Sequence, residues 1–431
     1  MLGFLVLVLV GTVLLSMPFA VEDGQAPGLM TAVFTATSAV CVTGLVVVDT
    51  ATYWSTAGEL IILGLIQAGG LGIMTLASLL GLLVFRRFGL RMRLTAQTET
   101  KSIGLGEVRR LVGRVILVSL IFELVLWVML ALRLYVGYDR RVGAAAYEGL
   151  FHSVSAFNNA GFALYSDSLM GFVTDPWICL PIAVAVIVGG IGFPVVLELW
   201  RRFRTPRAWS LHTKITVLAT AVLLAVGTVL ITALEWDNPK TMGAAGWSDK
   251  LLAGFFASAS ARTAGFNSLD VAGMEPATLL VHDMLMFIGG GSAGTAGGIK
   301  VATFALLAFV ILAEARGEPT VHVLGRKLSD GVQRQALTIV LLGIGLVMSA
   351  TVALLAVTSL DLDQVLFEVV SAFATVGLST GITDDLPVFG QLVLIVLMFV
   401  GRLGPITLAT AMALRERVRR YELPEERTIV G

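Results

Sequence analysis

Residues 39–45 read AVCVTGL and close a short apolar stretch on Gly44. The same pattern recurs three times, as AFNNAGF, SARTAGF and AFATVGL, with glycines at Gly161, Gly265 and Gly377. Each copy ends an apolar stretch of 10–12 residues, and a helix of that length covers about half of the roughly 30 Å hydrocarbon core of a bilayer. The irregular backbone that follows, called a return below, is tolerated inside a membrane only around a water-filled or ion-filled cavity.

The composition places the chain in a membrane. Of its 431 residues, 56% are hydrophobic and 14% are charged, with a mean hydropathy of +0.88, whereas soluble domains carry about 25% charged residues. The net charge of zero provides no basic field for nucleic acid. Cys41 and Cys179 have no metal-ligand spacing around them and predict neither a disulfide framework nor a zinc site.

Eight apolar segments are long enough to span a bilayer, and a short stretch lies between the two members of each successive pair. The predicted spans are residues 2–20, 59–85, 112–136, 177–200, 213–234, 277–313, 335–358 and 388–413. The predicted half-helices are residues 28–38, 146–157, 250–260 and 364–373. Segment 2–20 lacks the charged start of a cleavable signal, so we expect it to remain as a transmembrane helix.

The repeated order predicts an all-α integral membrane protein. It has four tandem helix–pore-loop–helix units, with eight spanning helices and four re-entrant half-helices in pseudo-fourfold symmetry around one pore. The predicted units are residues 1–94, 108–207, 212–316 and 332–420, followed by a short cytoplasmic tail at 421–431.

Loop charge predicts the orientation of a multi-pass protein with its returns facing outside. Basic residues follow the second helix of each unit and should lie in the cytoplasm; they are Arg86, Arg87, Arg91, Arg93, Arg201, Arg202, Arg204, Arg207, Arg316, Arg326, Lys327, Arg415, Arg417, Arg419 and Arg420. The loops beside the half-helices are mainly acidic, which favours cations at the outer mouth. Ordinary polarity of extracellular loops explains the same charge.

Glycine at the end of every return indicates a backbone requirement. Carbonyl groups replace the hydration shell of an ion only if successive carbonyls face one axis, and glycine adopts the necessary φ values freely. The side chains differ between the returns while the glycine is constant, which predicts an ion-binding filter of carbonyl oxygens. Its residues are Val42, Thr43, Gly44, Asn159, Ala160, Gly161, Thr263, Ala264, Gly265, Thr375, Val376 and Gly377. The alternative is that the glycines only let the backbone turn.

A run of small residues at 289–298 interrupts the predicted span 277–313 near its middle. Helices are strongly favoured at membrane depth, so unwound backbone there should line the conduction path. We take as a candidate gate the residues Gly289, Gly290, Gly291, Ser292, Gly294, Thr295, Gly297, Gly298, Lys300 and Arg402. Arg402 lies within the last span and must face protein or water, either opposing the pore or paired with a carboxylate. Glu123 and Asp283 have no counterpart in the other repeats and are predicted to be packing or interface residues.

The returns, the run GGGSAGTAGGIK and the GRLGP segment of the last helix resemble the Trk/Ktr/HKT superfamily of potassium transporters over essentially the whole chain. Because the chain begins almost at the first repeat, it is most similar to the Ktr-type membrane pore subunit. The resemblance implies K⁺ bound at the filter carbonyls as the transported ion, and Na⁺ in some members. In the family, a serine in place of the first filter glycine accompanies sodium selectivity, so Gly44 favours K⁺.

The same resemblance implies that residues 289–298 form an intramembrane gating loop with Arg402 as an electrostatic barrier. It also implies a homodimer in the bilayer of a bacterial-type plasma (inner) membrane. A separate cytosolic ring of nucleotide-binding regulatory subunits would contact it, with basic loop 86–114 and tail 414–431 as candidate contacts. No organic cofactor in this chain is implied.

Two other classes of function are alternatives to a passive pore. A proton- or sodium-coupled potassium symporter with alternating access would be favoured by inverted repeats, but these four units run in one direction. An intramembrane enzyme would need catalytic residues converging at one depth, and the sequence has no such constellation. We therefore expect a transport protein and not an enzyme.

Overall fold

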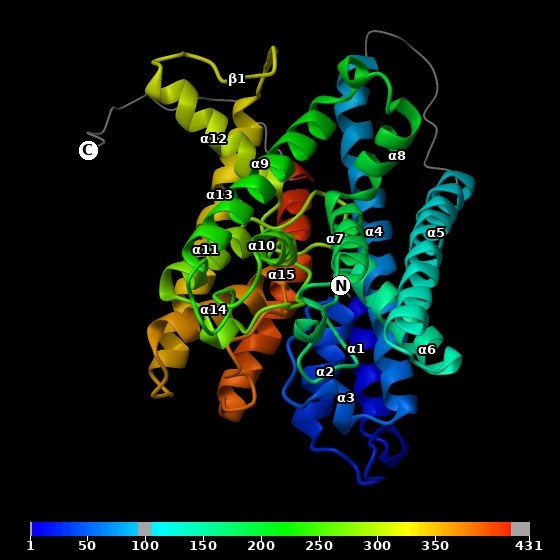
Figure 1. The fold of residues 1–431 in the computed structure, drawn as a ribbon. Coiled ribbons are helices and arrows are strands. Elements are labelled where there is room, and N and C mark those ends of the chain that lie inside the picture. The colour runs from blue at the N-terminus through cyan, green and yellow to red at the C-terminus, as the bar shows by residue number, and fades with distance from the viewer. Residues whose placement is uncertain (1, 94–104, 415–431) are drawn as a thin grey trace.

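The computed structural model describes residues 2–93 and 105–414, which form a helical protein (Figure 1). The longest helices are α4 (Thr56–Arg93), α5 (Leu105–Gly137), α9 (Leu211–Leu234), α13 (Asp330–Leu355) and α15 (Val388–Leu414). By length and composition, four helices of the described part could cross a membrane, or up to five if one bent pair counts as a span. The protein is therefore a multi-pass membrane protein, although the eight predicted spans are not all continuous helices.

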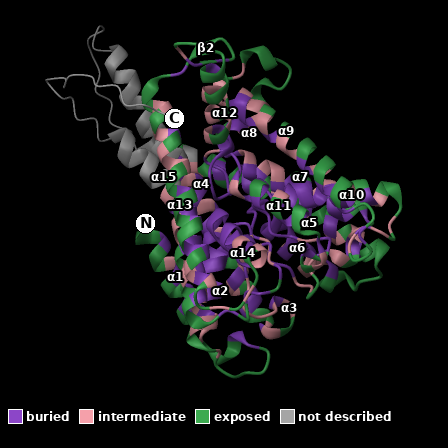
Figure 2. Ribbon diagram, turned by 90° about the vertical axis from the view of Figure 1, so that its left-hand side faces the viewer, coloured by how far each residue is buried: buried purple, intermediate pink, exposed green. Residues whose placement is uncertain are grey.

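Short helices occupy all four predicted half-helix stretches. They are α2 (Leu29–Cys41), α6 (Val142–Phe157), α10 (Trp247–Ser260) and α14 (Leu362–Ala374). Their C-terminal turns and the returns that follow are buried without a break, over residues 34–45, 151–160, 256–266 and 367–376. Figure 2 shows the buried residues gathered in the middle of the molecule, so the returns belong to its interior.

The predicted span 177–200 is wrong as a continuous helix. The structure has α7 (Pro176–Ile191) and α8 (Phe193–Arg202), bent by 105° at Gly192. Gly192 has φ 105°, a value that residues with a side chain rarely adopt, and Pro194 lies in the first turn of α8, where a missing N–H is harmless. The N–H of Phe193 donates instead to the carbonyl of Ala293, at 3.1 Å.

The predicted span 277–313 is interrupted where the run of small residues lies. It consists of α11 (Pro276–Phe287) and α12 (Val301–Ala315). The backbone between them is not helical, and its two ends are joined by a single parallel β-bridge between Ile288 and Ile299. The predicted span 2–20 is also shorter than expected, because α1 (Leu2–Leu15) ends before Pro18, which cannot continue a helix.

The remaining elements are small. They are α3 (Thr50–Tyr53), the 3₁₀ turns η1 (Pro18–Ala20), η2 (Met170–Phe172), η3 (Pro206–Ala208) and η4 (Val271–Gly273), and the strands β1 (His322–Val323) and β2 (Arg326–Lys327). The strands pair antiparallel across Leu324 and Gly325, which have φ 48° and 77°, as a two-residue hairpin turn requires. This hairpin is the exception to the all-α prediction.

The outer helices present apolar stripes to their surroundings. On α5, the residues Leu117, Leu120, Leu124 and Val128 are exposed at helical spacing, which is the lipid-facing pattern of a membrane helix. Exposed aromatic residues lie near helix ends, with Trp177 at the start of α7. Tryptophan is enriched where a membrane meets water. The exposed apolar surface is therefore a bilayer contact.

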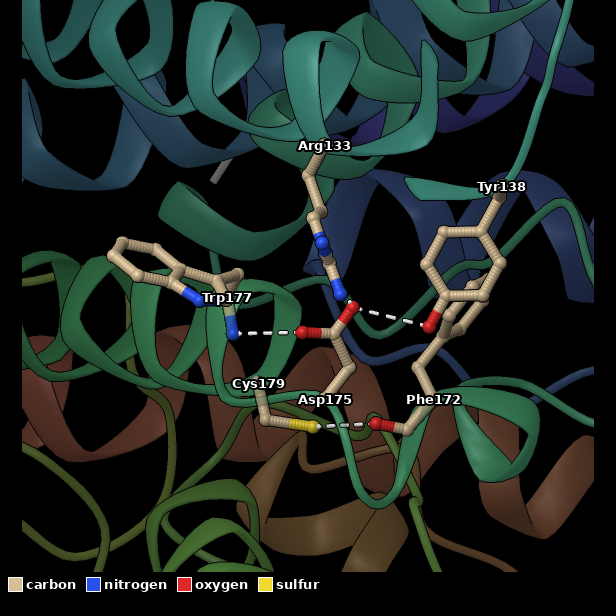
Figure 3. A network of polar contacts seen from close by, with 6 residues as sticks. All are labelled: Arg133, Tyr138, Phe172, Asp175, Trp177 and Cys179. Atoms are coloured by element: carbon tan, nitrogen blue, oxygen red, sulfur yellow. Dashed lines mark hydrogen bonds and ion pairs between the residues drawn. The ribbon is translucent and has the colours of Figure 1, made fainter. Parts of the chain in front are cut away.

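Asp175 joins the end of α5 to the start of α7 (Figure 3). Its carboxylate accepts hydrogen bonds from Arg133 Nε at 2.8 Å, from the Tyr138 hydroxyl at 3.0 Å and from the Trp177 N–H at 2.9 Å. Partial burial, and then the hydrogen bond to Asp175, raise the pKa of Tyr138 to about 12. Tyr138 therefore remains a neutral donor over the physiological pH range, and the contact fixes the loop that follows the second return.

Asp175→Ala should lower the free energy of unfolding by about 2 kcal/mol, since it removes the helix cap and leaves the Tyr138 hydroxyl without its acceptor. Arg133 is one-third exposed, so the ion pair itself contributes little. The midpoint of thermal unfolding in detergent measures the effect. Asp167→Ala, at an exposed aspartate of the same loop, should leave the midpoint unchanged, and equal losses in both variants would contradict the assignment.

Candidate ion pathway

The four returns share one backbone conformation. In each of them the residue two positions before the glycine has a positive φ: Val42 (55°), Asn159 (58°), Thr263 (73°) and Thr375 (51°). The glycines also have positive φ: Gly44 (93°), Gly161 (70°), Gly265 (78°) and Gly377 (97°). A left-handed conformation is unfavourable for β-branched residues, and strain of this kind persists mainly at functional sites. A simple turn does not require this pair of left-handed residues, and here the pair occurs at the same positions in all four returns.

The four glycines form a closed ring. A Cβ atom added to any one of them would meet the backbone of the next return in chain order, and one added to the last would meet the first. The backbone atoms so approached include the carbonyl oxygens of Ala160 (from Gly44), Ala264 (from Gly161), Val376 (from Gly265) and Thr43 (from Gly377). We call Gly44, Gly161, Gly265 and Gly377 the glycine ring. The repeats thus converge on a common centre in cyclic order.

A serine in the last turns of each half-helix holds its return in place. Ser38 and Ser371 accept hydrogen bonds from the N–H groups of Gly44 and Gly377, at 3.0 and 3.1 Å. In the other two repeats the serine instead donates to the carbonyl just after the glycine: Ser155 to Phe162 at 2.8 Å, and Ser260 to Phe266. These serines were not among the predicted site residues, although they recur five or six residues before each glycine.

The carbonyl oxygens that precede the glycines have no hydrogen-bond partner in the described part of the chain. Among the described residues, no hydrogen bond ends on the carbonyls of Val42, Thr43, Asn159, Ala160, Thr263, Ala264, Thr375 or Val376, and these residues are fully buried. The hydroxyls of Thr43 and Thr375 are likewise buried without a partner. Buried oxygens are normally hydrogen-bonded. A group of buried, unpaired oxygens around a ring matches the ligands that a dehydrated alkali cation needs.

The glycine ring opens toward one side into a cavity of about 310 Å³. All four ring glycines line it, together with Asp49 and Asp384 from the segments that follow the returns. Asp49 already caps α3 through the Ala51 N–H at 3.0 Å. Of these two carboxylates, Asp384 belongs to the acidic loops expected from the sequence, whereas Asp49 was not predicted and stabilises a helix start.

Residues 289–298, called the interruption loop, contact the returns from the other side. The Thr295 hydroxyl donates to Asn159 Oδ1 at 2.9 Å, and a Cβ atom on Gly297 would meet the side chain of Thr375. The loop is tied to the end of α7, since the Gly291 N–H donates to the Gly190 carbonyl at 2.7 Å. The interruption loop thus lies directly against the second and fourth returns.

Two buried cations hold the carbonyls of the interruption loop. Lys300 Nζ donates to the carbonyls of Ala296 at 2.6 Å and Gly297 at 3.3 Å, and Arg402 Nη1 donates to the Thr295 carbonyl. Within the described residues, Arg402 forms no ion pair with a carboxylate, and its Nε and Nη2 atoms have no partner. The predicted alternative, a pairing of Arg402 with a carboxylate, is therefore not seen among the described residues, and a role for Arg402 opposite the pore stays a prediction.

Glu123, which was predicted to be a packing or interface residue, takes part in a buried polar network. Its carboxylate accepts hydrogen bonds from Gln67 Nε2, at 3.0 and 3.1 Å, and from Asn158 Nδ2, at 3.2 Å. Asn158 also donates to Gln67 Oε1 at 2.8 Å. Because Asn158 is the first residue of the second return, Glu123 anchors that return to α4 and α5.

A family described as TrkH, cation transport protein, matches residues 5–420. The Ktr system potassium uptake protein B of Vibrio alginolyticus is 40% identical over 437 residues, covering 100% of this chain and 94% of that protein. The potassium/sodium uptake protein NtpJ of Enterococcus hirae is 34% identical, covering 100% of this chain and 96% of that protein.

Among solved structures, the potassium transporter TrkH from Vibrio parahaemolyticus is similar with a TM-score of 0.71. The match covers 96% of this chain and 84% of that chain, at 20% sequence identity. At that identity the likeness establishes a shared fold.

Proposed function

Because this chain belongs to the TrkH family of cation transport proteins, we propose that it takes up K⁺ through one pore whose filter is the glycine ring and the carbonyls before it. The observation that carries the proposal is the cyclic contact of the four ring glycines. A filter shared by four repeats needs their backbones to meet at one centre, and the cyclic contact supports this where four separate turns would not. The matched relatives named above are transporters and not enzymes.

The chemistry of the filter favours an alkali cation. Its oxygens are carbonyls and threonine hydroxyls, which replace hydration water around a weakly hydrated ion. Among the described residues, no group of three or more histidine, cysteine or acidic residues could hold a metal ion. K⁺ is the cargo we propose. Na⁺ is a second candidate cargo, because one relative is named a potassium/sodium uptake protein.

The interruption loop is the proposed gate. It lies against the inner end of the filter through Asn159 and Thr375, and its carbonyls are held by Lys300 and Arg402. Conduction then requires the loop to move away from the returns, which breaks these contacts. The positive charge of Arg402 below the filter also disfavours a cation there while the loop is in place.

The orientation and partners are proposed on the same basis. Arg201 and Arg202 are exposed in the last turn of α8. The positive-inside rule assigns that end of α8 to the cytoplasmic side of a bacterial-type inner membrane. We propose that two copies of the chain form a homodimer. Its cytoplasmic face would contact a separate cytosolic ring of nucleotide-binding subunits, since one relative is named as part of a Ktr system. Tail residues 415–431 and loop residues 94–104, both candidate contacts, lie outside the described residues.

The function is tested with the purified chain in liposomes. Under a K⁺ gradient, we expect a current whose reversal potential follows the K⁺ equilibrium potential. A reversal potential that shifts with the proton gradient at fixed K⁺ and Na⁺, or K⁺ uptake against its own gradient when only a Na⁺ gradient is imposed, would favour the symporter instead. Absence of any K⁺ flux from folded protein in K⁺-loaded liposomes would contradict both.

Ser371→Ala should lower the K⁺/Na⁺ permeability ratio about threefold to tenfold, because the Gly377 N–H loses its acceptor and the return is less firmly held. The ratio is measured from reversal potentials in bi-ionic solutions. Ser349→Ala provides the matched control, since Ser349 is exposed on α13 and its hydroxyl bonds only within its own helix. A ratio unchanged in Ser371→Ala would remove the serine from the filter support.

A further inference from the structure

Arg262 is a buried cation at the base of the third return. It lies immediately before Thr263 and is 7% exposed. Its guanidinium bridges two other elements: Nη1 donates to the Thr220 carbonyl of α9 at 3.2 Å, and Nη2 donates to the Gly289 carbonyl at 3.2 Å. Gly289 is the first residue of the interruption loop. One side chain therefore joins the peptide that enters the glycine ring to the start of the loop.

The charge of Arg262 is unusual because nothing of opposite sign pairs with it. In the part of the chain that the structure describes, no carboxylate forms an ion pair with this arginine, and its Nε atom has no partner. A buried charge held only by carbonyl dipoles is expensive at membrane depth, and such residues are functional candidates by default. Packing alone would be served better by an uncharged side chain.

A small cavity adjoins the guanidinium. It has a volume of about 10 Å³ and is lined by Thr220, Arg262, Gly190 and Gly290, among others. Thr220 Oγ1, like Arg262 Nε, is buried without a partner. This volume is about that of one water-sized probe, so the cavity beside the guanidinium has room for a single water.

The equivalent positions of the other repeats differ. Cys41 and Ala374 bear no charge, and Asn158 bonds to Glu123 and Gln67 in the preceding helices and not to the interruption loop. The aligned position is thus used to anchor the return in the second repeat, and to connect the return with the loop in the third.

We propose that Arg262 is a positioning residue that couples the interruption loop to the third return, so that movement of the loop alters the selectivity of the filter. When Gly289 moves, its carbonyl leaves Nη2, and the guanidinium transmits the change through one peptide bond to Thr263. This inference rests on the proposed function, because it assigns a link between the proposed gate and the proposed filter.

The test is a double-mutant cycle on the full chain in liposomes, with the K⁺/Na⁺ permeability ratio as readout. Arg402→Ala releases the loop, and Arg262→Gln cuts the link. We expect each single variant to lower the ratio about threefold to tenfold, the net contribution of one typical hydrogen bond. The double variant should be no lower than Arg262→Gln alone, because the loop can no longer act on the return.

Multiplying effects in the double variant, or a wild-type ratio in Arg262→Gln, would overturn the coupling, since independent structural defects are additive in free energy. Arg262→Lys keeps the cation without the fork, and the same cycle run with it decides the matter if Arg262→Gln does not reach the membrane. Thr220→Val keeps the carbonyl acceptor and should retain the wild-type ratio; a ratio as low as that of Arg262→Gln would also overturn the proposal. Wild-type protein without K⁺ selectivity would instead refute the proposed function.

Discussion

Serine in place of Gly377 is expected to reduce the K⁺/Na⁺ permeability ratio at least about tenfold, or about 1.4 kcal/mol of discrimination. Gly377 has φ 97°, which a residue with a side chain adopts only under strain. Its new Cβ atom would also overlap the Thr43 carbonyl oxygen and approach Gly44 Cα. The Thr43 oxygen, a proposed ion ligand, must therefore move. Reversal potentials in bi-ionic K⁺ and Na⁺ solutions measure the loss.

Gly381→Ser is a closely matched control. Gly381 has φ 92° and lies four residues further along the same segment, but a Cβ atom there would meet nothing within 4 Å. The two substitutions therefore carry a similar backbone penalty, and only one disturbs the glycine ring. Gly265→Ser should behave like Gly377→Ser, since its Cβ atom would overlap the Val376 carbonyl. Equal ratios in Gly377→Ser and Gly381→Ser would show that the ring does not select the ion.

The sequence was most informative where a short motif was repeated. The half-helices could be located because an apolar stretch of fixed length precedes each glycine, and the structure has α2, α6, α10 and α14 at those places. The family was also predictable, because several ordered motifs coincide over the whole chain. The cyclic order of the glycine ring could not be predicted, since no residue in one return identifies which other return it will contact.

Features set by tertiary contacts escaped prediction. The bend at Gly192 depends on the Ala293 carbonyl, which bonds Phe193 from a segment about 100 residues away. By hydropathy alone, residues 177–200 read as one helix. Arg262 was seen only as part of an aligned return, because its partners are backbone carbonyls that no sequence pattern marks. The serine anchors could have been found by extending the alignment back by six residues.

Arg402→Ala is expected to raise K⁺ flux about tenfold per folded protein. The substitution removes the donor to the Thr295 carbonyl, and a hydrogen bond from a charged group contributes about 1.5–3 kcal/mol. In a two-state gate that amount shifts the closed-to-open ratio by roughly tenfold or more. The variant also removes a positive charge below the filter. Flux is measured as uptake of a K⁺ tracer by liposomes, normalised to the amount of inserted protein.

Two further variants separate the contact from the charge. Arg402→Lys keeps the positive charge but loses the guanidinium geometry, so it should raise flux less than Arg402→Ala if electrostatics contribute to closure. Deletion of residues 289–298 removes the gate altogether and should give the largest flux. Lower flux in both Arg402→Ala and the deletion, with folding intact, would mean that the interruption loop supports conduction and does not gate it.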